Sequence, residues 1–404
     1  MLYTTGRMTR TKTIDILLNV GRRHSMANMD ILFSPLGGGQ EVGANCYLLK
    51  LGNDNLLLDC GIGNNRYMKY APDLYTPLKQ GLLQSLQQIS KIFISHAHLD
   101  HVGFLGEILK ENNTSAVYMT EVTKILTGIQ LKNCSLFKHK RNKQLNLYNS
   151  LLETRCTPVS FYQEIPFKDY SVTFLPAGHI PGAMMLLIRY AGRNILYTGD
   201  YSVNSTAFTT GCQLPNEKID ILITCGLHAR RSTHVKNSNL NRRFMHLSYY
   251  LDNGISVACN VHQLSKGIEL LKLLNQYYHN EVPIYVDESA MQVIKLLENK
   301  GIPIMEKNNY LLKNGIEKYP CITLSNKKHY FGGRFHSEDI DFSLHDDFNE
   351  TVDFIKKINP AQAVIIHSPP EKNYDDISVE QVIMRDADCR TQFIFPENGE
   401  IIVL

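Results

Sequence analysis

One ten-residue stretch constrains this chain more than any other. The segment ISHAHLDHVG, residues 94–103, brings together four side chains that bind metal ions: His96, His98, Asp100 and His101. Imidazoles held this close repel one another when protonated and lose hydration when buried, unless a cation lies between them. Neutral imidazole and carboxylate are ligands that suit zinc, manganese and iron. A single histidine at a strand end is usually a packing or capping residue, but four ligands in six positions predict a metal site.

The residues around this stretch indicate how it is placed. The preceding segment KIFIS, residues 91–95, is apolar and partly β-branched, so it predicts a buried strand. Because side chains alternate along a strand, His96 and His98 would leave its end on the same side. Asp100 and His101 fall in the turn that begins a predicted helix, VGFLGEILKE, and can face a second point nearby. One cluster can therefore serve two metal ions.

Three more candidate ligands follow other predicted strands. His179 comes after VTFLPAG, Asp200 after NILYTG and His367 after AQAVII. An aspartate at a strand end is usually a cap or turn residue, so each of the three would be ordinary alone. Together with the first cluster they make seven ligands, the complement expected for two metal ions that share a bridging carboxylate.

The composition limits the class of protein. With 404 residues, 43% of them hydrophobic, the chain is long enough for one large domain or two interleaved domains. The net charge of +3 gives no overall basic field that would indicate a nucleic-acid-binding protein. The nine cysteines are odd in number and form no CxxC pair, which favours reduced thiols in a cytoplasmic protein over a disulfide framework. No apolar run approaches the roughly 20 residues of a membrane span, so we expect no membrane partner.

The patterning along the chain predicts an α/β protein. Residues 1–28 are basic and poorly patterned, and we expect an N-terminal tail outside the fold rather than a signal peptide. Short alternating strands with Gly-rich turns run from about residue 30 to Asp59, and residues 70–90 have a helical pattern. From about residue 226, helices and strands alternate in the manner of a parallel α/β unit.

A resemblance to a known family is carried by the segments PLGGGQEVGANCYLL, LLLDCGIG, SHAHLDHVG, PAGHIPGAMM, ILYTGDYS and VIIHSPP. These resemble the metallo-β-lactamase superfamily, and the α/β insert followed by FSLHDD and VIIH resembles its β-CASP nucleases. That group includes ribonuclease J and the endonucleases of the cleavage–polyadenylation and Integrator complexes. The resemblance runs from about residue 30 to 404. It implies an αββα sandwich, residues 29–225 and 338–404, with an inserted α/β cap, residues 226–337.

The resemblance also implies a role for each candidate residue. One metal ion would be held by His96, His98 and His179, and the other by Asp100, His101 and His367, with Asp200 bridging them and Asp59 supporting the site from behind. The two ions would be divalent, zinc or, as in some relatives, manganese. Asp100 and His345 are the implied catalytic residues, and His345 in FSLHDD would be a general acid or a phosphate-binding group. Ser343 and Lys266 would also help to bind the substrate phosphate.

The chain departs from the family pattern in two places. Cys225 stands where relatives carry an acid that orients the histidine corresponding to His345. In the cap, the segment SKGIE has Lys266 and Glu269 where relatives have a Gly-Arg-x-Gln-Glu element. Because lysine offers a point charge where arginine offers a two-pronged fork, phosphate binding there would be weaker. The cap is also short beside those of its relatives.

The retained ligands favour an enzyme. We expect a metal-dependent phosphodiester hydrolase, a ribonuclease that cleaves single-stranded RNA with a water activated by two metal ions. A histidine at position 367 goes with the RNA-acting members of the family. Two alternatives remain open: a catalytically weak scaffold or regulatory subunit, and a metallohydrolase for a small phosphodiester or another ester. A homodimer or a protein complex is compatible with these readings.

Two basic groups are candidates for a nucleic-acid path. They are the segment KHKRNK, residues 138–143, and a set of four arginines: Arg230, Arg231, Arg242 and Arg243. A charged face in contact with solvent is the more common reason for such groups.

Overall fold

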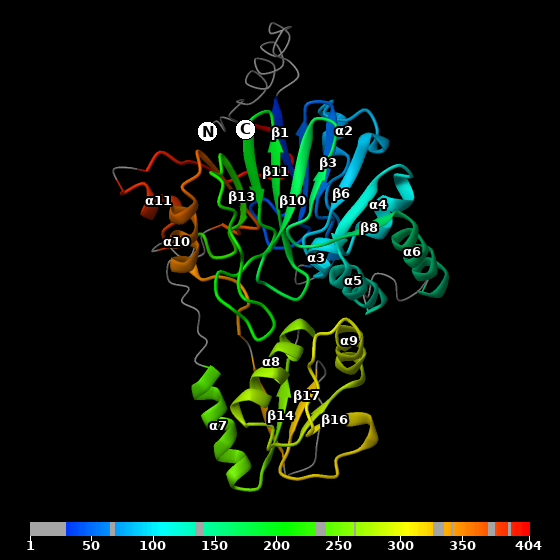
Figure 1. Ribbon diagram of the computed structural model, residues 1–404, viewed down its shortest axis with the longest axis vertical. Helices are drawn as coiled ribbons and strands as arrows, with labels where there is room; N and C mark the ends of the chain where they lie inside the picture. The colour runs from blue at the N-terminus through cyan, green and yellow to red at the C-terminus, as the bar shows by residue number, and fades with distance from the viewer. Residues whose placement is uncertain are drawn as a thin grey trace, which may run out of the picture.

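Two sheets packed face to face form the upper lobe of the molecule in Figure 1. The computed structural model describes residues 30–64, 69–133, 141–230, 240–261, 264–325, 335–340, 342–370, 376–386 and 389–404, so the expected tail, residues 1–28, lies outside it. The first sheet has the order β21-β1-β2-β3-β6-β7-β8, with bounds β1 Ile31–Gly37, β2 Cys46–Leu51, β3 Asp54–Leu58, β6 Ile89–Phe93, β7 Ala116–Thr120, β8 Cys156–Val159 and β21 Ile402–Val403. The second has the order β20-β19-β13-β12-β11-β10-β9, with bounds β9 Glu164–Pro166, β10 Tyr170–Pro176, β11 Met184–Tyr190, β12 Arg193–Tyr197, β13 Ile221–Cys225, β19 Gln362–Ile366 and β20 Gln392–Ile394.

Apolar side chains from both sheets fill the space between them. Tyr47 on β2 meets Tyr197 on β12 with ring centroids 6.1 Å apart, and Phe93 on β6 meets Phe174 on β10 at 6.3 Å. All four rings are fully buried. Strands β1, β2 and β3 pair antiparallel, which confirms the predicted meander up to Asp59.

Helices cover the outer faces of both sheets. On the first sheet, Leu105 and Ile108 belong to the buried cluster that also contains Ile92 of β6. On the second, Phe354 and Ile355 pack in a cluster with Ile365 of β19. The helices of this lobe are α2 Thr76–Lys79, α3 Leu99–Val102, α4 Leu105–Glu111, α5 Glu121–Asn133, α6 Arg141–Arg155, α10 Phe348–Ile358 and α11 Val379–Ile383. The expected αββα sandwich is therefore present.

The helical pattern predicted over residues 70–90 was largely wrong. Only α2 and the short 3-10 helix Leu86–Gln88 form there. Pro77 lies in the first turn of α2, where its missing N–H costs nothing, and Gly81 follows the helix with φ +75°, a conformation that ends a helix readily. The remaining segment instead places Leu74 and Leu83 in the cluster beneath the first sheet.

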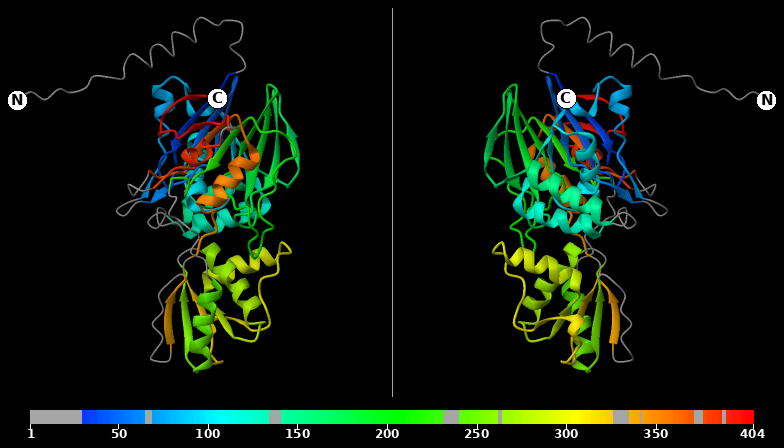
Figure 2. Two further views of the ribbon diagram at one scale, coloured as in Figure 1. Left: turned by 90° about the vertical axis from the view of Figure 1, so that its left-hand side faces the viewer. Right: turned by 90° about the vertical axis from the view of Figure 1, so that its right-hand side faces the viewer.

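A third sheet forms the lower lobe, the cap, which Figure 2 shows from two sides. Its order is β16-β15-β17-β14-β18, and its paired strands are all parallel, as the sequence pattern predicted. The bounds are α7 Leu240–Asp252, β14 Ser256–Asn260, α8 Leu264–Tyr277, β15 Ile284–Val286, α9 Glu288–Glu298, β16 Asn309–Leu311, β17 Ile322–Ser325 and β18 Phe335–Asp339. Strand β18 runs past residue 338, where we expected the chain to return to the sandwich. The division into domains at residues 226 and 338 stays a prediction.

Helices α8 and α9 form the contact between the cap and the sandwich. Ile268 of α8 and Val293 of α9 share a cavity lining with Leu126 and Ile180 of the sandwich. The carboxylate of Glu269 on α8, with 5% of its surface exposed, accepts the backbone N–H of Ala207 in the loop after β12. Burial raises the pKa of Glu269 from 4.5 to about 7, because desolvation disfavours the charged form. Among the described residues, no helix has the length and apolar character needed to cross a bilayer.

The buried carboxyl of Glu269 predicts a pH-dependent stability. Between pH 4.5 and 7 the unfolded chain loses this proton while the folded chain keeps it, so the free energy of unfolding falls as pH rises. Glu269→Gln keeps an oxygen for the Ala207 N–H and removes this loss. Denaturant titration should show the variant close to wild type at pH 5 and more stable at pH 8, by up to about 3 kcal/mol. Glu288→Gln, an exposed position on α9, is the control, and equal pH dependence of wild type and Glu269→Gln would contradict the assignment.

Candidate metal centre

The predicted ligands come together at the ends of four strands. His96 and His98 lie between β6 and α3, His179 follows β10, Asp200 follows β12 and His367 follows β19. Asp100 and His101 belong to α3 itself. All of them are buried or partly buried. Strands from both sheets therefore bring the seven side chains of the sequence prediction to one place.

A close backbone contact holds α3 against the loop after β3. Asn45 N–H donates to Asp100 O at 2.9 Å, and Cys60 N–H donates to His101 O at 2.7 Å. Between these contacts, a Cβ at Gly61 would overlap the carbonyl oxygen of Asp100. Glycine at position 61 thus lets two backbone segments approach closely enough to fix Asp100 and His101.

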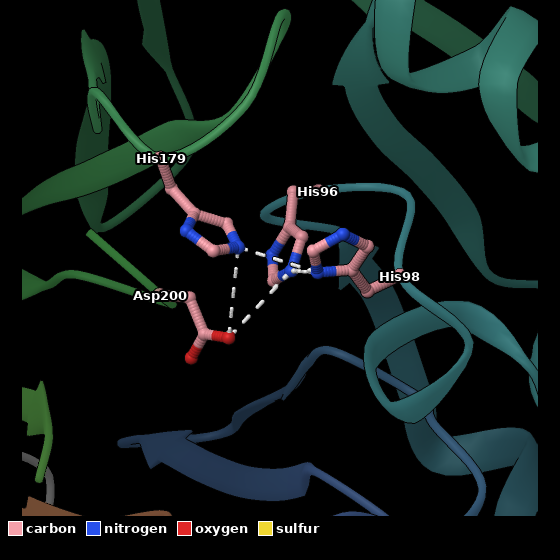
Figure 3. Close-up of side chains that lie close together, drawn as sticks. All are labelled: His96, His98, His179 and Asp200. Atoms are coloured by element: carbon pink, nitrogen blue, oxygen red, sulfur yellow. Dashed lines mark hydrogen bonds and ion pairs between the residues drawn. The ribbon is translucent and has the colours of Figure 1, made fainter. Parts of the chain in front are cut away.

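The first ligand group consists of His96, His98, His179 and Asp200 (Figure 3). His98 Nδ1 lies 3.0 Å from His96 Nε2 and 3.2 Å from His179 Nε2. Asp200 Oδ2 is 3.7 Å from His96 Nε2 and 4.0 Å from His179 Nε2. Figure 3 shows these four side chains pointing toward one another. One nitrogen of each ring and one carboxylate oxygen therefore face a common point.

The second ligand group consists of Asp100, His101 and His367. Asp100 Oδ2 lies 3.8 Å from both His101 Nε2 and His367 Nε2. Asp200 joins this group to the first, because its Oδ2 is 3.3 Å from His101 Nε2 and its Oδ1 is 3.1 Å from His367 Nδ1. The Asp200 carboxylate thus stands between the two groups, as a bridging ligand requires.

The carboxylate of Asp59 contacts this arrangement from behind. It is fully buried, has φ +58°, and accepts hydrogen bonds from the backbone and hydroxyl of Ser95, both at 2.7 Å. It also accepts the hydroxyl of Tyr197 and lies 2.7 Å from His101 Nδ1. A proton on Nδ1 leaves the Nε2 lone pair of His101 free to face the second group, which is how a carboxylate partner fixes a metal-binding tautomer.

Burial controls the protonation of the imidazoles. It lowers the pKa of His96, and with the neighbouring His179 ring it lowers the pKa of His98 to about 3. Burial also lowers the pKa of His179. His101 differs, because the carboxylates of Asp200 and Asp59 outweigh burial and raise its pKa well above the ordinary value. The rings of His96, His98 and His179 are therefore neutral, whereas the His101 ring favours its protonated form. This pattern indicates a pocket in which the carboxylates are not fully balanced by positive charge.

The donor set fits divalent cations. Two buried ring nitrogens, His367 Nε2 and His345 Nδ1, have no hydrogen-bond partner among the described residues. Leaving a buried nitrogen unsatisfied costs free energy, and a cation can remove that cost at His367 Nε2. Imidazole and carboxylate donors arranged in two groups around a shared carboxylate match the chemistry of borderline divalent metal ions.

One of the expected substrate-binding residues, His345, lies beside the first ligand group, and the other two lie near the segment that carries it. The His345 ring has its centroid 4.6 Å from that of His179, and its Nδ1 is 3.8 Å from Asp200 Oδ2. Ser343 accepts the His345 N–H at 3.1 Å and lines a cavity of about 560 Å³ that also includes Glu269. Lys266 Nζ lies 5.9 Å from the ring centroid of Phe342. The structure thus gathers all three side chains around the segment 342–345.

Two contacts to the ligands were missed by the sequence analysis. Asn45 Nδ2 lies 2.9 Å from His101 Nε2 and 3.4 Å from Asp100 Oδ2. Ser265 Oγ, in the cap, lies 2.9 Å from His98 Nε2. Asn45 could have been suspected from its place in the segment GANCYLL, whereas nothing local marks Ser265.

The basic groups give no defined path for a nucleic acid. Residues 138–140 and Arg231 lie outside the described residues. Arg230 stacks on Phe395 at 4.1 Å and donates to Gln40 at 2.9 Å. Arg243 donates to the backbone of Asp339 at 3.2 Å. These contacts favour a packing role for Arg230 and leave the proposed path a prediction.

The family follows from comparison with known proteins. A family model described as the metallo-beta-lactamase superfamily matches residues 39–242, about half of the chain. The matched span contains six of the seven candidate ligands and Asp59. The chain belongs to the metallo-beta-lactamase superfamily.

Three named proteins are similar to this chain. The chain is 32% identical over 283 residues to the Probable RNase MJ4 of Methanocaldococcus jannaschii, covering 67% of this chain and 62% of that protein. It is 30% identical to Cleavage and polyadenylation specificity factor 73 of Drosophila melanogaster, covering 63% of this chain and 38% of that protein. It is 28% identical to Integrator complex subunit 11 of Danio rerio, covering 63% and 44%. The chain therefore spans less than two thirds of the length of these relatives.

These relatives confirm the resemblance to the β-CASP group of the superfamily. A crystal structure of a protein of unknown function from Enterococcus faecalis superimposes with a TM-score of 0.62, covering 93% of this chain and 100% of that one. The identity of 15% means that this second likeness shows the fold alone. The expected fold, a metallo-β-lactamase sandwich with an inserted α/β cap, is confirmed.

Cys225 is the place where this superfamily member differs from what the resemblance implied. The resemblance implied that position 225 faces His345, with a cysteine in place of the acid that relatives carry there. The structure instead places its sulfur 3.7 Å from His367 Nδ1, in a group with Asp200. Burial raises the pKa of the Cys225 thiol well above its ordinary value. The thiol is therefore a neutral neighbour of His367.

The position of Asp59 leads to a prediction about metal affinity. In Asp59→Asn the amide can turn its NH₂ toward His101, which moves the ring proton to Nε2 and removes a donor from the second ligand group. We expect the weaker-bound of two metal ions to lose affinity by about 10- to 100-fold, the usual cost of losing such a partner. Metal analysis after equilibrium dialysis measures this.

Tyr197→Phe is the matched control, because it removes one hydrogen bond to Asp59 but leaves the carboxylate and the His101 contact in place. It should change metal affinity much less than Asp59→Asn. Wild-type affinity for both ions in Asp59→Asn would contradict the assigned role of the carboxylate.

Proposed function

We propose that this chain is a metal-dependent phosphodiester hydrolase that cleaves single-stranded RNA. The observation that carries the proposal is the Asp200 carboxylate, which lies between two groups of buried histidines and carboxylates. Such a pair of adjacent sites suits displacement at phosphorus. Relatives whose names include RNase and endoribonuclease support RNA as the substrate.

The residues assign two places for divalent ions. His96, His98 and His179 would hold one, Asp100, His101 and His367 the other, and Asp200 would bridge them. Zinc is the identity we favour, because imidazole nitrogens predominate among the donors, and manganese is the alternative. When bound, two such ions supply Lewis acidity, which makes water a better nucleophile at neutral pH and stabilises negative charge on phosphoryl oxygens.

His345 would bind the substrate phosphate. Burial, together with the rings of His179 and His367, holds its pKa well below the ordinary value, although Asp200 acts in the opposite direction. A neutral imidazole is a poor general acid but a good hydrogen-bond donor to a phosphate oxygen. Of the two roles that the sequence left open for His345, phosphate binding is therefore the one we propose.

Two neighbours of His345 would complete the phosphate site. Ser343 is held by its bond to the His345 backbone and lines the adjacent cavity. Lys266, on the cap helix α8, lies near Phe342 and would bring a positive charge to the same segment. Because lysine binds phosphate as a point charge, this contact would neutralise the substrate without fixing its orientation.

The position of the cap supports a single strand as the substrate. Ser265 of α8 touches the ligand His98 directly, so the cap covers one side of the first ligand group. A single strand with exposed bases can enter a site that is covered on one side more readily than a stiff duplex can.

We also propose a cytoplasmic location, because the eight described cysteines are free thiols. Assembly into a homodimer or a larger complex stays a prediction.

Retention of the ligand set argues against a catalytically weak scaffold. A comparison of substrates tests the other alternative, a metallohydrolase for a small phosphodiester or another ester. End-labelled single-stranded RNA, single-stranded DNA, duplex DNA and a small phosphodiester would be incubated with the metal-loaded protein. We expect cleavage of RNA to be fastest, to stop with a chelator and to return with zinc or manganese. Asp200→Ala and His367→Ala should each lower the rate by at least about 100-fold, the scale for loss of a group that stabilises developing charge.

His246→Ala is the control, since this histidine is 54% exposed on α7 of the cap. It should cleave RNA at the wild-type rate. Cleavage confined to the small phosphodiester would replace RNA as the substrate class. No hydrolysis of any substrate by protein that holds two ions would favour the scaffold.

A further inference from the structure

The cap makes a direct contact with the ligand set through Ser265. This serine is the second residue of α8, and its Oγ lies 2.9 Å from Nε2 of His98. The other ring nitrogen of His98, Nδ1, is the one that faces His96 and His179 at 3.0 and 3.2 Å. Ser265 therefore contacts the outer nitrogen of a ligand whose inner nitrogen points into the first group.

The outer nitrogens of three other ligands are held by the sandwich itself. Nδ1 of His96 lies 3.0 Å from Ser95 Oγ, and Nδ1 of His101 lies 2.7 Å from Asp59 Oδ2. Nδ1 of His179 donates to the backbone oxygen of Leu344 at 3.1 Å. For His98 the corresponding partner comes from the cap. The orientation of this one ring thus depends on where α8 lies.

A second side chain on the same face of α8 reaches the loop that supports His179. Glu269 follows Ser265 by one helical turn, and its carboxylate accepts the N–H of Ala207. Thr206, the preceding residue, pairs with Thr209 through their hydroxyls at 3.0 Å. Thr209 Oγ1 in turn donates at 2.6 Å to the carbonyl of Gly178, the residue before His179.

Gly178 links these hydrogen bonds to His179, because its backbone is tightly packed. Its φ is +79°, and a Cβ there would lie 2.5 Å from the backbone of Gly211, Cys212 and Ser202. A carbonyl held between packed backbone and the Thr209 hydroxyl fixes the start of the His179 loop. One face of α8 is therefore connected to two residues of the first ligand group. It contacts His98 directly and reaches His179 through a short chain of hydrogen bonds.

We propose that Ser265 is a positioning residue for the first metal site, and that docking of α8 is coupled to binding of a divalent cation by His96, His98 and His179. The inference rests on the metal-dependent function proposed above. When Nδ1 of His98 directs its lone pair at a cation, the ring proton must sit on Nε2, and Nε2–H then donates to Ser265 Oγ. Cation binding and the Ser265 contact select the same tautomer and the same ring orientation.

Coupling of this kind is reciprocal. If the docked cap raises the affinity of the first site, occupation of that site must stabilise the docked cap by the same factor. Opening the cap to admit a substrate would then loosen His98, while the second group, held through Asp59 and Asn45 of the sandwich, would stay in place. The two ions should therefore respond differently to any change at the face of α8.

Metal titration of the 404-residue chain tests the inference without reference to catalysis. Zinc would be titrated into wild type, Ser265→Ala and Ser265→Thr in competition with a chromophoric chelator, which resolves two dissociation constants. We expect Ser265→Ala to weaken one site about tenfold and leave the other unchanged. Ser265→Thr keeps the hydroxyl and should restore the wild-type constants. The matched control is Ser248→Ala, whose hydroxyl bonds within the cap to the Phe244 backbone and Tyr278.

Hydrogen exchange of α8 provides the reciprocal measurement. Adding zinc should slow exchange of the α8 amides in wild type and in Ser248→Ala, and should do so much less in Ser265→Ala. Two wild-type constants in Ser265→Ala, or a loss that Ser265→Thr does not restore, would overturn the inference. Failure of the wild-type chain to bind two ions would instead overturn the proposed function.

Discussion

The candidate centre depends on the hydrogen bonds of the buried Asp59 carboxylate. A charge at this depth is tolerated because its oxygens are satisfied by Ser95, His101 and Tyr197, which belong to different parts of the sandwich. Ser95 follows β6 in the first sheet, whereas Tyr197 ends β12 in the second. The Asp59 carboxylate therefore joins the two sheets at the ends of inner strands, and it contacts the His101 ring whose tautomer we propose it sets. Packing of the sandwich and geometry of the site are linked through one side chain.

The crowding of imidazoles is an arrangement that positive charge between the rings would stabilise. The ring of His96 has its centroid 4.1 Å from that of His101, 4.7 Å from that of His98 and 4.9 Å from that of His179. The pKa values of His96, His98 and His179 are lowered, and these rings direct nitrogen atoms at one another and at the Asp200 carboxylate. The sandwich supplies the rigid strand ends that hold this arrangement, and divalent cations would replace the repulsion with coordination.

Much of the site could be predicted because its signals are local. The spacing of His96, His98 and His101, and histidine or aspartate at the ends of apolar runs, are visible without a structure. The helix predicted for residues 70–90 was wrong because Pro77 and Gly81 limit it to a single turn. The contact of Ser265 with His98 spans 167 positions and depends on how the cap rests on the sandwich. Neither periodicity nor spacing carries that information, and the same holds for the position of the Cys225 sulfur against His367.

The most direct test of the account is anomalous diffraction from crystals grown with zinc or manganese, recorded at the absorption edge of the metal. Two peaks should appear in each chain. One should lie among His96 Nε2, His98 Nδ1 and His179 Nε2, and the other among Asp100, His101 and His367, with Asp200 in contact with both. A single peak, or an ion ligated by Cys225 in place of the Asp100 group, would contradict the central claim that these seven side chains form one two-metal centre.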